Sequence, residues 1–276
     1  MQHLDAEERE LVPRMDFEGW LSHLLVAMSN HASHCIRYLN VATSSRDDLD
    51  GLKHVLPALP CLDRLDLKYK TSPLLSQRDT APLFSLGPRG SIPSLRTLCL
   101  TNFTVDSNRV TGWDQCHHIR HLGLDGGAEL LQLLALFTGK ISDMTSLTLR
   151  IHDGTSPGIS DDLYSRLDKF LRSVNALAAF TAYDLSKGIL PLVVSRHGPH
   201  LRRLRFRQTN FNVSDENQIR CHFTFEELQN LASGLPQLQR LGVDLQFKGH
   251  LVCTRPGILT VMARAPLTDH PSRTTY

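Results

Sequence analysis

The chain has 276 residues, 41% of them hydrophobic and 21% charged, which is typical of a folded protein and excludes disorder throughout. Its 30 Lys and Arg residues nearly balance its 28 Asp and Glu residues, so the overall charge gives no reason to expect binding to nucleic acid or to a membrane surface. There is no run of about 18 apolar residues, which excludes a membrane-spanning helix. Because the cysteines form no CxxC pair and no signal peptide is recognisable, we expect a cytoplasmic or nuclear protein.

Residues 1–30 are predicted to form an N-terminal extension and a capping helix. Residues 1–14 are charged, whereas the apolar residues between Phe17 and Met28 recur with the spacing of one helix face. A helix at this position would cover the edge of the first strand of a stacked fold.

Residues 31–248 contain a short phrase that returns eight times: an apolar residue, two of any type, an apolar residue, one of any type, and an apolar residue. The copies are Ile36-Leu39-Val41, Leu62-Leu65-Leu67, Leu95-Leu98-Leu100, Ile119-Leu122-Leu124, Met144-Leu147-Leu149, Leu177-Phe180-Ala182, Leu201-Leu204-Phe206 and Leu238-Leu241-Val243. They begin 24 to 37 residues apart, and the shorter intervals are typical of leucine-rich repeats. The alternation at the end of each phrase predicts a strand.

Segments with helical spacing precede most of these strands. The clearest are Leu130–Phe137, Leu163–Val174 and Phe225–Leu231. We expect Gly139, Gly198 and Gly234 to end helices in the left-handed conformation. A single strand and helix cannot bury their apolar faces alone, whereas stacked units can. The sequence therefore predicts an α/β leucine-rich-repeat solenoid with irregular repeats, with a parallel sheet on the concave face and helices on the convex face.

Three insertions interrupt the repeats. Residues 70–91, 152–162 and 209–222 are rich in Pro, Gly, Ser, Asn and Asp, so we predict surface loops. Residues 249–276 contain no further phrase and are predicted to form an irregular C-terminal tail.

Segments 103–140, 196–211 and 231–245 resemble fungal F-box/leucine-rich-repeat-like proteins. The resemblance concerns the repeat region, since residues 1–25 do not show the spacing of an F-box. It implies that the repeats recognise a protein client, as the client-recognition part of a ubiquitin-ligase adaptor does.

One motif suggests an enzyme. Residues 154–158, Gly-Thr-Ser-Pro-Gly, match the nucleophile elbow of hydrolases, with Ser156 as the nucleophile. The elbow uses the backbone N–H of the next residue to stabilise the oxyanion, and Pro157 has none. We therefore favour a Pro/Gly loop over a hydrolase-type enzyme.

Two further motifs suggest ligands. Cys116, His117, His118 and His121 are residue types that bind zinc, but His117 and His118 should point to opposite sides of the chain as it enters a strand. The segment Asp125-Gly126-Gly127 could hold a phosphate, although Asp125 would repel it, so a turn and a capped helix start are favoured. We expect no metal and no cofactor.

The binding surface is predicted from the period of two along each strand. Residues between and beside the apolar positions should share one face, which places three arginines on one strand and a fourth on its neighbour. The predicted partner-binding residues are Arg203, Arg205, Arg207, Arg240, Arg150 and Tyr183. Guanidinium groups pair with carboxylates and phosphates, so we predict a non-catalytic interaction module for an acidic or phosphorylated protein. The alternatives are an ordinary solvated basic face and a structural repeat fragment without independent function.

Overall fold

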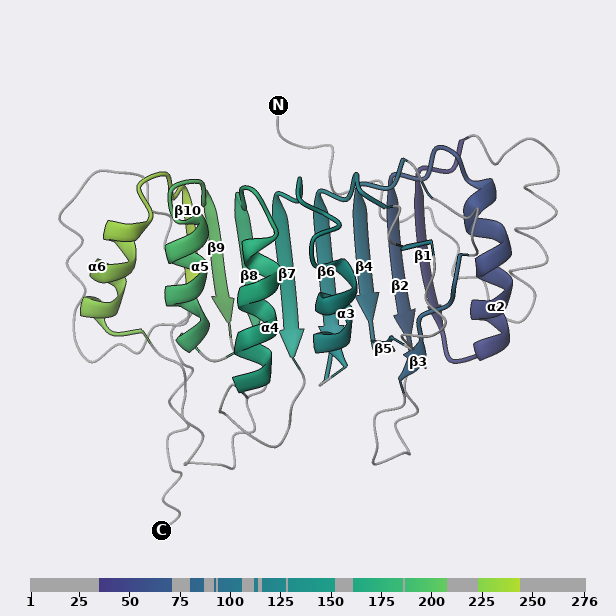
Figure 1. Cartoon of the computed structure of the whole chain (residues 1–276), viewed down its shortest axis with the longest axis horizontal. Coiled ribbons are helices and arrows are strands. Elements are labelled where there is room, and N and C mark those ends of the chain that lie inside the picture. Colours follow the sequence, from purple (N-terminus) through teal and green to yellow (C-terminus); the bar gives the residue numbers. More distant parts are fainter. Residues whose placement is uncertain are drawn as a thin grey trace, which may run out of the picture.

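The computed structural model describes residues 35–70, 80–86, 92, 94–105, 112–113, 116–127, 129–151, 161–185, 187–207 and 223–243. The main strands are β1 (Tyr38–Thr43), β2 (Arg64–Tyr69), β4 (Thr97–Thr101), β6 (His121–Gly126), β7 (Ser146–Ile151), β8 (Ala179–Tyr183), β9 (Arg203–Arg207) and β10 (Arg240–Val243). They form one parallel sheet in which neighbours follow the order of the chain (Figure 1). Each of the eight phrases coincides with one strand, which confirms the predicted parallel sheet.

Alternation along the strands produces two buried rows of apolar side chains. Leu122 and Leu124 of β6 are buried, and they are in register with equivalent apolar residues on both neighbouring strands. The first row is Leu39, Leu65, Leu98, Leu122, Leu147, Phe180, Leu204 and Leu241. Because side chains alternate between faces, the residues between these positions must point the opposite way.

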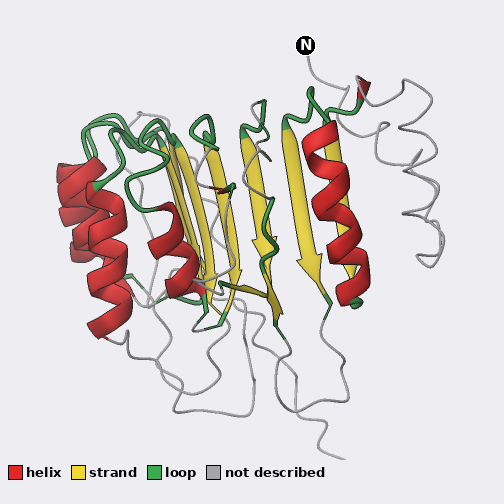
Figure 2. Cartoon of the chain, turned by 45° about the vertical axis from the view of Figure 1, so that its right-hand side comes forward, coloured by secondary structure: helices red, strands yellow, loops and turns green. Residues whose placement is uncertain are grey.

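Helices cover the buried face of the sheet. They are α2 (Arg46–Val55), α3 (Leu130–Phe137), α4 (Asp161–Arg172), α5 (Leu190–His197) and α6 (Phe225–Gly234), with short 3₁₀ helices η3 (Leu56–Ala58) and η5 (Lys187–Ile189). All five α-helices lie on one side of the strands (Figure 2), and buried residues of helices and strands belong to one apolar core. The architecture is therefore α/β, with a parallel sheet that is covered by helices on one face.

Three of the helices agree with the predicted segments, α5 ends next to Gly198, where a helix end was expected, and α2 was not predicted. In the segments at α3, α4 and α6, apolar residues recur with helical spacing. α6 also begins with a capping box between Thr224 and Glu227. α2 contains Gly51 in its interior, and α5 begins at Leu190, has Pro191 in its first turn and contains two valines. Gly51 and the valines lower intrinsic helix propensity, whereas proline is tolerated in the first turn, so burial against the sheet stabilises α2 and α5.

The predicted surface loop at 70–91 is wrong for its central part. Among the described residues no helix lies between β2 and β6; instead β3 (Ala81–Pro82) pairs with β5 (Phe103–Thr104). The following Leu83 and Phe84 are buried, and the indole Nε1 of Trp113 donates a hydrogen bond to the Phe84 carbonyl oxygen at 2.8 Å. Apolar residues within a Pro- and Ser-rich segment fill the space behind the sheet, which composition alone did not reveal.

The predicted left-handed helix ends are correct at one of three glycines. Gly139 follows α3 with φ +77°, as expected. Gly198 has φ −47° and continues the helical conformation of α5, and Gly234 lies inside α6 without a positive φ. A Cβ atom at Gly198 would lie 2.2 Å from the carbonyl oxygen of Gly234, so these two glycines allow α5 and α6 to approach closely.

Several predictions lie outside the described residues. They concern the capping helix at 1–30, the loop that contains Ser156, the insertion at 209–222 and the tail at 249–276. In the described part of the chain, none of the helices has the length and apolar character that a membrane crossing requires.

Candidate interaction surface

The open face is the side of the sheet that points away from the helices. Its side chains form three rows across the strands, because the parallel strands pair in a constant register. The first row is Tyr38, Arg64, Thr97, His121, Ser146, Ala179, Arg203 and Arg240; the second is Asn40, Asp66, Cys99, Gly123, Thr148, Thr181, Arg205 and Gly242; the third is Ala42, Lys68, Thr101, Asp125, Arg150, Tyr183 and Arg207. The predicted binding residues therefore all lie on this face.

Four of them form an arginine cluster at the C-terminal end of the open face. Arg203, Arg205 and Arg207 alternate along β9 with Leu204 and Phe206, whose burial fixes the direction of the strand. On β10, Arg240 pairs in register with Arg203. We call Arg203, Arg205, Arg207 and Arg240 the arginine cluster. Within the described residues none of them forms an ion pair with an acidic side chain.

The charges of the cluster oppose folding slightly. Neighbouring strands are about 4.8 Å apart, and like charges directly opposite one another destabilise a sheet. Two charges 5 Å apart in water repel by roughly 0.8 kcal/mol before screening by salt. Arg203, Arg205 and Arg240 are exposed, which keeps the cost small, while Arg207 is half-buried.

Arg150 and Tyr183 contact each other beside the cluster. The guanidinium carbon of Arg150 lies 4.4 Å from the ring centre of Tyr183, a distance typical of a cation–π contact. Its Nη1 is also 3.9 Å from Oδ2 of Asp125, on the strand on the other side. Arg150 thus has an acidic neighbour within the chain, whereas the arginine cluster has none among the described residues. Tyr183 is in register with Arg207 and forms the border of the cluster.

A second polar group occupies the N-terminal end of the open face. Nη2 of Arg64 lies 2.9 Å from Oδ2 of Asp66, and the Tyr38 hydroxyl donates a hydrogen bond to the same oxygen at 3.1 Å. The guanidinium also lies over the Tyr38 ring, 5.1 Å from its centre. We call Tyr38, Arg64, Asp66 and Cys99 the N-terminal polar group. The period of two places Arg64 beside Asp66, but the contacts with Tyr38 and Cys99 depend on the register between strands.

Cys99 is a protonated thiol within this group. Burial, and then the charge and hydrogen bond of Asp66, raise the pKa of the Cys99 thiol to about 12. The pKa of Tyr38 is also raised, by burial and by Asp66. Since the thiolate is the reactive form of cysteine, Cys99 is a poor nucleophile at neutral pH.

The cysteine and histidines before β6 do not assemble into a metal site. Cys116 is buried, whereas His117 and His118 are both exposed in a turn that precedes β6, so they lie before the strand on which the predicted alternation was based. Nδ1 of His117 lies 3.0 Å from the Lys140 carbonyl oxygen. Among the described residues no group of three His, Cys, Asp or Glu side chains could hold a metal ion.

The capped helix start predicted at residues 125–127 is also wrong. Asp125 and Gly126 are the last residues of β6, and α3 begins at Leu130 after Glu129, which makes no side-chain cap. The alternation that ends the strand continues through Asp125, so its carboxylate lies on the open face near Arg150.

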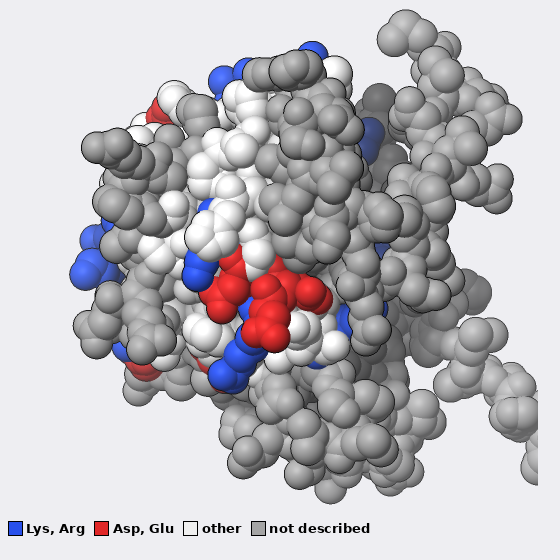
Figure 3. Space-filling view, turned by 90° about the vertical axis from the view of Figure 1, so that its right-hand side faces the viewer, with Lys and Arg blue, Asp and Glu red and all other residues white. Residues whose placement is uncertain are grey.

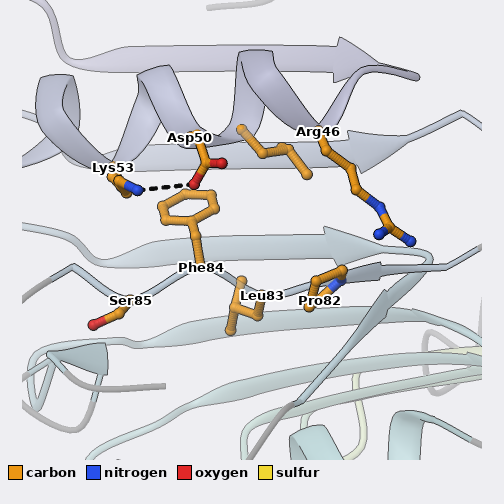
Figure 4. Close-up of a pocket in the computed structure, with 8 residues that line it drawn as sticks. Arg46, Asp50, Lys53, Pro82, Leu83, Phe84 and Ser85 are labelled. Atoms are coloured by element: carbon orange, nitrogen blue, oxygen red, sulfur yellow. Dashed lines mark hydrogen bonds and ion pairs between the residues drawn. The ribbon is translucent and has the colours of Figure 1, made fainter. Parts of the chain in front are cut away.

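A pocket of about 510 Å³ lies on the helix side, between α2 and the extended segment at 82–85 (Figure 4). Its lining residues are Arg46, Leu49, Asp50, Lys53, Pro82, Leu83, Phe84 and Ser85. The carboxylate of Asp50 is held by Lys53, with Nζ 2.9 Å from Oδ1. Figure 3 looks onto this end of the molecule, where acidic side chains gather; α2 carries Asp47, Asp48 and Asp50 there. None of the predicted binding residues lines this pocket.

Comparison of the chain with models of known protein families gives no match, and comparison with curated proteins gives none either. What the molecule binds is therefore inferred from its open face, where exposed cations gather at one end.

Proposed function

We propose that the chain is a non-catalytic protein-interaction module that binds an acidic segment of a protein partner on its open face. The observation that carries the proposal is the arginine cluster: four arginines on two neighbouring strands, without an acidic partner among the described residues. Guanidinium groups form paired hydrogen bonds with carboxylates, so a row of them suits an acidic peptide.

A leucine-rich-repeat solenoid is the finer fold that we propose. It is supported by strands that follow chain order, by helices on one side only, and by phrases 24 to 37 residues apart. In such a fold the sheet lines the concave face, where extended partners are bound. The resemblance to F-box/leucine-rich-repeat-like proteins agrees with this proposal and adds client recognition for a ubiquitin ligase as one context.

The contrast with other charges on the same face argues against an ordinary solvated surface. Arg64 is paired with Asp66, and Arg150 lies near Asp125. The sheet therefore neutralises its arginines elsewhere with acidic residues at adjacent positions. Among the described residues the arginine cluster has no such compensation, which is expected where the compensating charge belongs to a partner.

Affinity purification from cells with tagged full chains would test the proposal. The variant carries Arg203→Glu and Arg205→Glu, and the control carries Arg37→Glu and Lys169→Glu, an equal change of charge at exposed positions before β1 and on α4. We expect at least one protein that the parent and the control retain and the arginine variant loses. Thermal unfolding of all three chains verifies that they fold. An identical set of retained proteins for the three chains would exclude binding at the cluster, and recovery of a ubiquitin-ligase scaffold protein would support the adaptor context.

A further inference from the structure

Building on the proposed function, we propose that the partner segment carries a phosphorylated side chain, and that Arg203, Arg205 and Arg240 form the phosphoryl-binding site. These three residues lie on β9 and β10, the last two strands of the described sheet (Figure 1). The first observation behind this inference is the pairing between the two strands.

Arg203 and Arg240 are the one pair of like charges in register among the described strands of the sheet. The comparable position on β6 and β7 has opposite charges, Asp125 and Arg150. At a strand spacing of about 4.8 Å, two guanidinium groups can donate to different oxygens of one dianion. Their pairing is unfavourable in the free chain and becomes favourable once an anion lies between them.

The second observation is the space above Gly242, which allows the Arg205 side chain to lie over β10, the strand that carries Arg240. A Cβ atom at Gly242 would lie 3.5 Å from Cγ and 3.6 Å from Nε of Arg205. The side chain of Arg205 therefore extends across β10, over the residue that lies two positions after Arg240. A larger side chain at position 242 would occupy this space and displace the Arg205 guanidinium.

The number of cations distinguishes a phosphoryl group from a carboxylate. One carboxylate carries a single charge and two oxygens, which one guanidinium can satisfy with two hydrogen bonds. A phosphoryl group carries a charge of about −1.5 to −2 at neutral pH and three acceptor oxygens. Three neighbouring arginines match the phosphoryl group in both charge and donor number, whereas a single carboxylate would leave two cations uncompensated.

Peptide binding at physiological ionic strength would test the inference. The probes are short random peptide libraries with a central phosphoserine, with serine, or with glutamate, measured by fluorescence polarisation with the full chain. We expect the phosphoserine library to bind about tenfold more tightly than the glutamate library, since phosphate adds charge-assisted hydrogen bonds. Arg240→Gln should remove most of this preference.

Two variants at position 242 distinguish binding by a positioned Arg205 side chain from nonspecific electrostatic attraction. Gly242→Leu keeps every charge but displaces Arg205, so it should remove most of the preference for phosphoserine. Gly242→Ala is the matched control, because its Cβ atom would make only ordinary van der Waals contact. Unchanged discrimination in Gly242→Leu would overturn the site as described.

The outcomes distinguish this inference from the proposed function. Equal binding of the glutamate and phosphoserine libraries, abolished by Arg203→Glu with Arg205→Glu, would overturn the phosphoryl site and leave the acidic-peptide proposal standing. Failure of every library, together with unchanged co-purification in the arginine variant, would overturn both. Binding to vesicles that contain a phosphorylated lipid, without binding to phosphoserine peptides, would overturn a protein segment as the ligand.

Discussion

The two ends of the open face use the same scaffold in opposite ways. At the N-terminal end Arg64, Asp66 and Tyr38 contact one another, and the positive charge is compensated within the chain. At the C-terminal end, Arg203 faces Arg240 without an acidic partner among the described residues. Both groups occupy equivalent rows of one sheet, so the backbone does not require either arrangement. The difference shows that this face carries a compensated charge at one end and, among the described residues, an uncompensated cluster at the other.

The largest expected effect comes from disrupting the buried apolar row of the sheet, on which both ends of the open face depend. Leu122→Asp would place a carboxylate between apolar neighbours in the centre of the sheet, at a cost of about 5 kcal/mol or more. We expect no cooperative unfolding transition by circular dichroism. His121→Asp, one residue away on the open face, is the matched control and should change stability little. A cooperatively folded Leu122→Asp chain would contradict the buried position of this row.

Charge reversal at the N-terminal end should have the next largest effect. Arg64→Glu removes the ion pair with Asp66 and places two carboxylates together, so we expect a loss of about 1 kcal/mol in the free energy of unfolding. Urea denaturation measures this loss. Arg64→Gln, which removes the pair without adding repulsion, should lose less, and a high salt concentration should reduce the difference between the two variants.

Charge reversal at the C-terminal end should have the opposite sign. Arg240→Glu replaces a repulsive pair in register by an attractive one, so we expect a gain of about 0.5 kcal/mol in the free energy of unfolding. The same urea series measures it, with Arg240→Gln as the intermediate. Destabilisation by Arg240→Glu would show that the cluster is compensated within the chain, and the contrast between the two ends would disappear.

The smallest effect concerns the thiol in the N-terminal polar group. Because its pKa is about 12, Cys99 should react with iodoacetamide at a rate that continues to rise well above pH 9. Mass spectrometry of peptides alkylated at successive pH values measures the rate. Asp66→Asn should lower the pKa of the thiol only in part, since burial is the larger cause. Rapid alkylation of Cys99 at neutral pH would contradict the half-buried, protonated state.

Patterns that repeat along one strand could be predicted from the sequence, and contacts between strands could not. The alternation of Leu204 and Phe206 with arginines is visible in five consecutive residues, so the strand and its exposed face follow directly. The contact between Arg150 and Tyr183 requires the register of β7 and β8, which depends on the length of the connection between them. Aligning the phrases gives the residues that are in register on neighbouring strands. It does not show which of their side chains are in contact.

The prediction of the fold failed mainly in segments whose residue composition does not reflect how deeply they are buried. Phe84 lies within a Pro- and Ser-rich insertion, and its carbonyl group accepts a hydrogen bond from Trp113, distant in the sequence. Turn-forming residues predict where a chain bends, but they do not exclude a buried stretch between bends. In α2 and α5 the opposite holds, since weak local propensity is overcome by packing against the sheet.

The close approach of α5 and α6 has a consequence for the shape of the surface beneath the arginines. Hydrogen bonds keep β9 and β10 at a fixed spacing, while Gly198 and Gly234 allow the two helices behind them to touch. A methyl group at either position would push α5 and α6 apart on the helix side, while the spacing of the strands would stay the same. The last two strands would then bend more tightly around the open face and bring the tips of Arg203 and Arg240 closer together. The local curvature of the sheet beneath the arginine cluster is therefore limited by the absence of a side chain at Gly198 and Gly234 on the helix side.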